Sequence, residues 1–141
     1  MIKDLTLLLV EDDDVVTESI QRAFQKAGLK SSLVVAEHGQ IALDILRNTH
    51  PDRSIHKPYV VLLDLNMPVM NGFEFLEQIR EDPALRDTVV FVLTTSNVDS
   101  DRTRAYYNNV AGYMVKSSVG PQFSKLAMLL DSYRDAVELP E

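Results

Sequence analysis

The amino-acid sequence predicts a three-layer α/β fold built on a five-stranded, mainly parallel sheet. Short β-branched or Leu-rich runs alternate along the chain with longer segments of helical period. Three of the runs are apolar without interruption, at residues 7–10, 60–63 and 89–93. Such runs are typical of strands that are covered on both faces, as in a parallel sheet between two layers of helices. Strands that alternate with helices in this way are joined by right-handed crossovers.

The expected strands follow from these runs in chain order. They span residues 5–10, 32–36, 59–64, 89–94 and 112–116. The first, third and fourth contain the uninterrupted apolar runs, whereas the second and fifth are less uniformly apolar.

Apolar residues at helical spacing predict the first three helices. The first helix carries them at i, i+4, i+7, i+8 and i+11: Val16, Ile20, Ala23, Phe24 and Ala27. Gly28 follows at the position of a terminating glycine. The second helix is marked by the apolar residues within 42–46. The third is marked by Leu76 and Ile79, and it is expected to open after Asn71-Gly72 and to end before Pro83.

The last two helices differ in polarity. The segment 99–109 is mostly polar, and only Ala105 and Tyr106 form an apolar face. Apolar residues of the fifth helix share one face, and Pro121 suits its first turn; they are Phe123, Leu126, Ala127, Leu130 and Val137.

Composition excludes several classes of protein. The 141 residues fit one domain, residues 1–141, and predict no separate output module. The absence of Cys excludes disulfides, a thiol nucleophile and thiolate metal sites. No apolar run approaches the about 20 residues of a membrane span, so we expect a cytoplasmic protein without a membrane partner. Fourteen Lys and Arg against 21 Asp and Glu give a net charge of −7, which disfavours nucleic acid as a partner.

Polar residues with complementary chemistry stand at the carboxyl ends of four predicted strands. The acidic run Glu11-Asp12-Asp13 follows the first strand, and Asp64 ends the third. Thr94 ends the fourth strand and Lys116 the fifth. Ligands of open α/β sheets bind at this edge, where the strand order reverses. We therefore expect two or three carboxylates of the acidic run to surround one crevice together with the other three side chains.

The residue types indicate metal-assisted phosphoryl transfer. Clustered carboxylates repel one another unless a proton or a cation intervenes, and oxygen ligands select a hard ion such as Mg²⁺. A carboxylate beside such an ion can act as a nucleophile and form an aspartyl phosphate. Lys supplies a positive charge for phosphoryl oxygens, and Thr donates a hydrogen bond to them. Taken singly, each residue also has a structural interpretation, as a helix cap, a turn, a strand residue or a surface lysine.

The same residues resemble those of the receiver domain of bacterial two-component response regulators. The resemblance runs from LLLVEDDD through VVLLDLNMPVMNG and VVFVLTT to GYMVK, over nearly the whole chain. It implies a flavodoxin-like (βα)5 fold with a parallel sheet of order 2-1-3-4-5. It further implies a phosphorylation switch that turns over no external substrate.

Roles for individual residues follow from that resemblance. Asp64 resembles the phosphoacceptor. Glu11 and Asp12 resemble the acidic pair that binds Mg²⁺, with Asp12 the direct ligand and Glu11 acting through water. Asn66 resembles the residue whose backbone carbonyl completes the shell of the ion. The remaining three resemble the residues that bind phosphate and switch the surface: Thr94, Lys116 and the aromatic Tyr113.

The sequence departs from the family pattern after the lysine. Receivers usually have Pro there, behind a cis peptide, but this chain has Ser117. A cis bond before a residue other than Pro costs about 2.5–4 kcal/mol. We therefore predict a trans Lys116–Ser117 bond, with Lys116 still able to reach the phosphoryl group.

A finer resemblance links the chain to stand-alone receivers that partner bacterial phytochromes. It rests on the long loop before KPYVVLLDLNMP, the stretch LTTSNVDSD and the tail SYRDAVELP, which holds Tyr133-Arg134. It implies phosphorylation by a sensor histidine kinase with a light-sensing region, or by a phosphotransfer protein. It also implies a downstream protein target and a homodimer formed through the fourth helix, fifth strand and fifth helix.

Three alternatives remain at this stage. A phosphatase of the haloacid dehalogenase type needs a second Asp two residues after the nucleophile, where this chain has Asn66. A flavodoxin-like nucleotide-binding module needs a phosphate loop after the first strand, where four acids would repel phosphate. A receiver that is never phosphorylated, and acts only as a docking surface, stays compatible with Ser117.

Overall fold

The computed structural model describes residues 5–29, 31–67 and 69–141. Its parallel sheet contains β1 (Leu5–Val10), β2 (Ser31–Ala36), β3 (Tyr59–Leu63), β4 (Val90–Thr94) and β5 (Gly112–Val115). The strand order is β2-β1-β3-β4-β5, so the order reverses between β1 and β3. The predicted fold class and strand order are both confirmed. Pro68, in the LDLNMPVMNG motif, lies outside the described residues.

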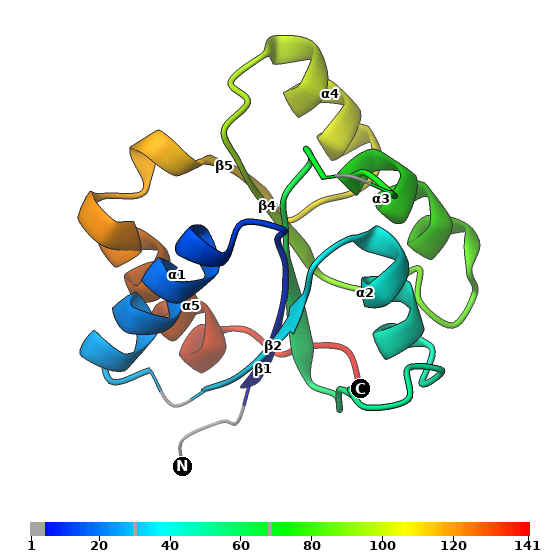
Figure 1. Ribbon diagram of the computed structural model, residues 1–141, viewed down its shortest axis with the longest axis horizontal. Helices are drawn as coiled ribbons and strands as arrows, with labels where there is room; N and C mark the ends of the chain where they lie inside the picture. Colours follow the sequence, from blue (N-terminus) through cyan, green and yellow to red (C-terminus); the bar gives the residue numbers. More distant parts are fainter. Residues whose placement is uncertain (1–4, 30, 68) are drawn as a thin grey trace.

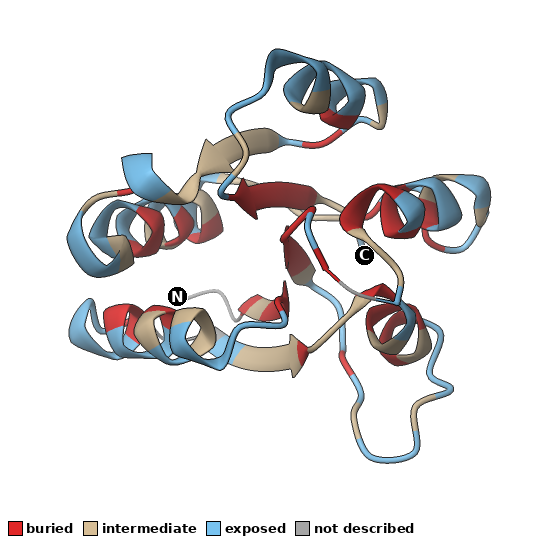
Figure 2. Ribbon diagram, turned by 45° about the horizontal axis from the view of Figure 1, so that its top comes forward, coloured by how far each residue is buried: buried red, intermediate tan, exposed pale blue. Residues whose placement is uncertain are grey.

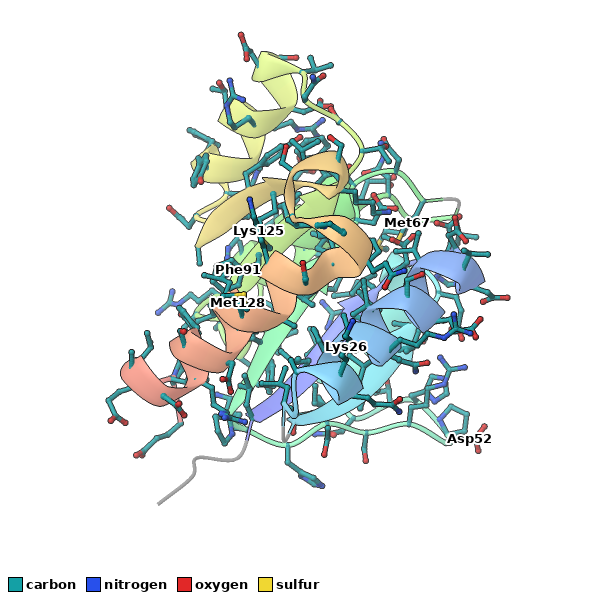
Figure 3. All side chains as sticks on the ribbon, turned by 90° about the vertical axis from the view of Figure 1, so that its left-hand side faces the viewer. Lys26, Asp52, Met67, Phe91, Lys125 and Met128 are labelled. Carbon is teal, nitrogen blue, oxygen red and sulfur yellow. The ribbon has the colours of Figure 1, made fainter. Side chains whose placement is uncertain are left out.

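The described residues form five α-helices, which cover the two faces of the sheet as outer layers (Figure 1). Helices α1 (Asp14–Lys26) and α5 (Ser124–Ala136) lie together on one side. Figure 3 looks onto this pair, with Lys26 on α1 and Met128 on α5. The other side carries α2 (Gly39–Leu46), α3 (Gly72–Glu81) and α4 (Asp99–Tyr107). None of the helices formed by the described residues has the length and apolar character needed to cross a bilayer.

Alternation along β1 explains why its sequence is apolar throughout. Leu8 and Val10 point into the core beneath α2, α3 and α4. Leu7 and Leu9 point into the second core beneath α1 and α5. Successive strand side chains face opposite sides of a sheet, so a strand between two helical layers needs an apolar residue at every position. The helices bury only their inner faces (Figure 2).

Local sequence sets the ends of α1 and α3. Asp13 caps α1 by accepting the backbone N–H of Val15 at 2.9 Å. Gly28 adopts a φ of 68° just beyond that helix, where a side chain would be strained, as the sequence predicts. Asn71 and Glu74 form a capping box at the start of α3, with each side chain accepting the backbone N–H of the other residue.

The beginning of the fifth helix differs from the prediction. Pro121 opens a separate 3₁₀ turn, Pro121–Phe123, and α5 starts only at Ser124. Gln122 and Phe123 have φ angles of 52° and 62°, which interrupt a continuous helix. Phe123 still packs against the core beneath α1 and α5. The prediction was therefore right about the buried Leu126, Ala127 and Leu130, and wrong about both ends, because Val137 lies beyond the helix in extended backbone.

Helix α4 is anchored weakly by apolar contacts. Of its residues, all of them described, only Ala105 is buried, and Tyr106, predicted to share its apolar face, is 49% exposed. Figure 2 shows a mostly exposed α4 beside a half-buried α3. Polar contacts replace the missing apolar ones. Arg104 donates to Glu77 of α3 at 2.8 Å and lies over the ring of Phe73. Elements with few buried contacts move at low energetic cost.

Candidate functional site

The structure brings the predicted polar residues together at the carboxyl edge of the sheet, at the top in Figure 1. Glu11 and Asp12 follow β1, and Asp64 follows β3. Thr94 is the last residue of β4, and Lys116 begins a 3₁₀ turn, Lys116–Ser118, directly after β5. These strands are neighbours in the sheet, so their ends meet although the residues are far apart in sequence.

Lys116 joins two of the carboxylates. Its Nζ lies 2.6 Å from Oε1 of Glu11 and 3.5 Å from Oδ2 of Asp64. The Glu11 side chain is 2% exposed, that of Asp64 is 7% and that of Lys116 is 13%. Asp12, by contrast, is exposed. One ammonium group therefore faces two buried carboxylates, with a third at the mouth of the site.

This charge balance perturbs the ionisation of the site. Burial, supported by the negative charge of Asp64, raises the pKa of Glu11 to about 7, although the hydrogen bond from Lys116 opposes the rise. Burial would lower the pKa of Lys116, but the hydrogen bonds and charges of Glu11 and Asp64 outweigh it, and the pKa is raised. The ammonium therefore stays in its charged form. It can neutralise only one of the two buried carboxylates, so one negative charge is left without a positive partner.

The missing positive charge fits a divalent cation. Glu11, Asp12 and Asp64 each offer a carboxylate oxygen, and these atoms lie within 4.8 Å of one another. No other group of three such residues is found in the described part of the chain. Donors that are all oxygen suit Mg²⁺, Mn²⁺ or Ca²⁺ rather than zinc or copper. The open position of Asp12 leaves access for solvent and for a ligand.

The acidic run therefore divides into two parts with different functions. Glu11 and Asp12 face the carboxylate site. Asp13 caps α1, and Asp14 lies in its first turn, where negative charge is favourable. The sequence allowed for either two or three site carboxylates after β1, and the structure places two of them there.

The loop after β3 is closely held where it carries Asp64. The N–H of Asp64 donates to Val10 O at 3.0 Å, and Oδ1 of Asp64 accepts the N–H of Asn66 at 3.2 Å. Gly72 then donates to Leu65 O at 3.0 Å. A Cβ atom on Gly72 would stand 2.6 Å from the Asp64 carbonyl oxygen, closer than real contacts allow. From the sequence, Gly72 is expected only at the start of the helix, because the close approach to Asp64 exists only in the folded loop.

Thr94 and Tyr113 connect to the same loop after β4. Thr94 is fully buried, and its Oγ1 accepts the N–H of Ser96 at 3.4 Å. Tyr113 is half-buried, and its hydroxyl donates to Ser96 O at 2.9 Å. The Tyr113 ring packs against the core beneath α2, α3 and α4, so it already lies inward in this structure.

The bond between Lys116 and Ser117 is trans, as predicted. Among the described residues, the only cis peptide bond joins Lys57 and Pro58. Lys116 nevertheless reaches both Glu11 and Asp64. Proline after the lysine is therefore not required to direct the ammonium group into this site.

Comparison with known proteins agrees with this geometry. The family model of the response regulator receiver domain matches residues 7–126. The probable methanogenesis regulatory protein FilR2 of Methanothrix harundinacea is 42% identical over 110 residues, 78% of this chain and 70% of that protein. Response regulator Rcp1 of Synechocystis sp. is 30% identical over 135 residues, 95% of this chain and 92% of that protein.

Solved structures of such proteins superpose over almost the full chain. The Mn²⁺-bound form of Rcp1 gives a TM-score of 0.84 at 29% identity, covering 96% of this chain and 99% of that chain. The phosphorylated cyanobacterial phytochrome response regulator RcpA also gives 0.84 at 29% identity, covering 96% and 98%. The finer resemblance to receivers that partner phytochromes is therefore matched by structural similarity.

Proposed function

The chain belongs to the response regulator receiver domain family, and from that premise we propose that Asp64 accepts a phosphoryl group from a phosphohistidine of a partner protein. The observation that carries the proposal is the set of three carboxylates with one half-buried lysine. A carboxylate that is held beside an ammonium group, and open to ligands at one side, is suited to nucleophilic attack on phosphorus.

Receiver domains bind Mg²⁺ at an acidic pocket, and here Glu11, Asp12 and Asp64 would hold the ion, with the Asn66 carbonyl completing its shell. When bound, the ion neutralises negative charge on the incoming phosphoryl group. These carboxylates would hold the ion at the carboxyl end of β1 and β3. Lys116 would supply a second positive charge, since its Nζ lies 3.5 Å from Oδ2 of Asp64.

The transfer step exchanges one bond to phosphorus for another. An oxygen of Asp64 attacks the phosphorus atom while the bond to the imidazole nitrogen of the donor breaks, and the electron pair of that bond stays on the imidazole. Lys116 leaves Glu11 to pair with phosphoryl oxygens. The Thr94 hydroxyl turns to donate a hydrogen bond to them, and so gives up its contact with Ser96.

The signal to a partner protein follows from the movement of the Thr94 side chain. We propose that the shift of Thr94 rearranges the loop after β4, and with it Tyr113 and α4. Helix α4 has little apolar anchorage, so a modest local change can displace it. A downstream protein, or a second copy docked through α4, β5 and α5, would read the altered surface. We further propose that the phosphoryl donor is a phytochrome-type histidine kinase or a phosphotransfer protein.

Phosphoryl labelling tests the proposed function directly. The protein is incubated with Mg²⁺ and acetyl phosphate, or with a phosphorylated histidine kinase, and its mass is measured. We expect one added phosphoryl group, which hydroxylamine removes as it does an acyl phosphate, and which does not form when a chelator is present during the incubation. Label that resists both treatments would contradict the proposal, and continuous release of phosphate from small phosphomonoesters would favour an enzyme instead.

The affinity for Mg²⁺ is expected to depend on pH. Burial raises the pKa of Glu11 to about 7, so a proton competes with the ion below that pH. The affinity should rise about tenfold between about pH 6 and about pH 8 and then level off. Calorimetric titration with Mg²⁺ measures it. Glu11→Gln removes the competing proton and should flatten the profile; an equally steep profile in this variant would exclude Glu11 as the source.

A further inference from the structure

Ser96 connects three parts of the molecule through different atoms. Its N–H donates to Thr94 Oγ1, and its carbonyl accepts the Tyr113 hydroxyl at 2.9 Å. Its own hydroxyl donates to Oδ2 of Asp101 at 2.6 Å and accepts the N–H of Val98 at 3.3 Å. The Ser96 backbone thus contacts the predicted switch residues, while its side chain contacts the first turn of α4.

The contact with Asp101 ties the loop after β4 to the start of α4. Val98 stands at the N-cap of α4, and its side chain makes no capping hydrogen bond. The Ser96 hydroxyl accepts the N–H of Val98, just before the helix, and Asp101 fixes that hydroxyl from inside the helix. At the other end, Arg80 of α3 donates to the carbonyls of Asn108 and Asn109. The amino end of α4 therefore depends on the Ser96–Asp101 pair.

We propose that Asp101 is a positioning residue that, through Ser96, holds Tyr113 in its inward position. The Ser96 carbonyl can meet the Tyr113 hydroxyl only while the loop after β4 keeps its present course. Asp101 is half-buried and bonded to the side chain of that same residue, so it fixes the course of the loop. This inference rests on the proposed function for its meaning, because it makes α4 and Tyr113 parts of one switching unit.

Charge alone does not account for the contact. Asp99 lies in the same first turn and carries the same charge near the helix N-terminus, but it is exposed and pairs with Arg102. A general dipole effect would make both carboxylates matter equally. A positioning effect requires Asp101 and leaves Asp99 without influence on Tyr113. The two residues therefore form a matched pair for an experiment.

The test follows Tyr113 by fluorine NMR in protein labelled with 3-fluorotyrosine, without any phosphoryl donor. The chain has five Tyr, and Tyr113→Phe assigns the resonance. In Asp101→Ala, we expect the inward population of Tyr113 to fall about fivefold relative to the outward one, as the loss of one hydrogen bond would give. Asp101→Asn keeps an acceptor oxygen and should resemble the wild type, and so should Asp99→Ala.

A double variant tests whether Asp101 acts through Ser96. Ser96→Ala should shift the Tyr113 resonance as Asp101→Ala does, and the two together should shift it no further. An unchanged resonance in Asp101→Ala, or an equal shift in Asp99→Ala, would overturn the inference. Additive shifts in the double variant would overturn the path through Ser96. These NMR measurements need no phosphoryl donor, so their outcome is independent of the labelling result. Failure of Asp64 to accept phosphate would leave the role of Asp101 intact, and normal labelling would not restore that role if the NMR measurements contradict it.

Discussion

Asp64→Asn is expected to abolish phosphoryl labelling, with a loss of at least about 100-fold in the amount of acyl phosphate formed. An amide oxygen is a far poorer nucleophile than a carboxylate, and the amide also removes one of the three oxygen donors of the cation site. Labelling with acetyl phosphate and Mg²⁺, followed by mass measurement, gives the result. Peptide mapping of the wild-type protein should place the added group on the fragment that contains residue 64.

The substitution should not act through unfolding. Asp64 and Glu11 are both buried carboxylates near one ammonium group, and the charge of Asp64 helps to raise the pKa of Glu11. Replacing Asp64 by an amide of the same shape relieves that repulsion. The melting temperature of the metal-free variant should therefore equal or exceed that of the wild type. A lower melting temperature would mean that the loss of label reports structural damage.

Asp13→Asn is the matched control for the acidic part of the site. Asp13 belongs to the same run of acids as Asp12, but its side chain caps α1 and is not one of the three clustered carboxylates. Asn is also a good N-cap residue, so the helix should be kept. This variant should label normally. Full labelling of Asp64→Asn, or equal loss in Asp13→Asn, would contradict the assignment of Asp64.

Most of the fold could be predicted because the three central strands, β1, β3 and β4, are buried on both faces. The predicted strand boundaries differ from the observed ones by one residue at most, since an apolar run in a parallel sheet ends where the chain leaves the two cores. The meeting of Glu11, Asp64, Thr94 and Lys116 could be predicted for the same reason. Residues that follow parallel strands come to one edge whatever the loops between them do.

Features that depend on loop conformation could not be predicted. Gln122 and Phe123 have left-handed backbone angles, but neither is a glycine or asparagine, the residue types that usually mark such a position. The sequence pattern therefore placed Pro121 inside the fifth helix. The bond between Ser96 and Asp101 depends on how the loop folds back onto the next helix. Neither Ser96 nor Asp101 is unusual in residue type or in its spacing along the sequence. Their relation becomes visible only from the hydrogen bonds.

The second large effect is expected at Gly72, which packs directly against the backbone of Asp64, the proposed phosphoacceptor. A Cβ atom at this position would lie 2.6 Å from the carbonyl oxygen of Asp64 and 2.7 Å from Cα of Leu65. Both are backbone atoms, so no side-chain rotation can make room. Gly72→Ala should therefore lower the free energy of unfolding by about 3 kcal/mol, at the upper end of the usual cost of overpacking, and urea denaturation measures it.

Gly28→Ala separates this steric effect from the general cost of replacing a glycine. Gly28 has a φ of 68°, yet a Cβ atom there would meet no atom within 4 Å. Its replacement should cost about 1 kcal/mol in backbone strain and leave labelling of Asp64 unchanged. Gly72→Ala should also reduce labelling in conditions where the variant is still folded, because the loop must move and Asp64 moves with it. Normal labelling in a folded but destabilised Gly72→Ala would show that helix α3 yields instead of the phosphoacceptor loop.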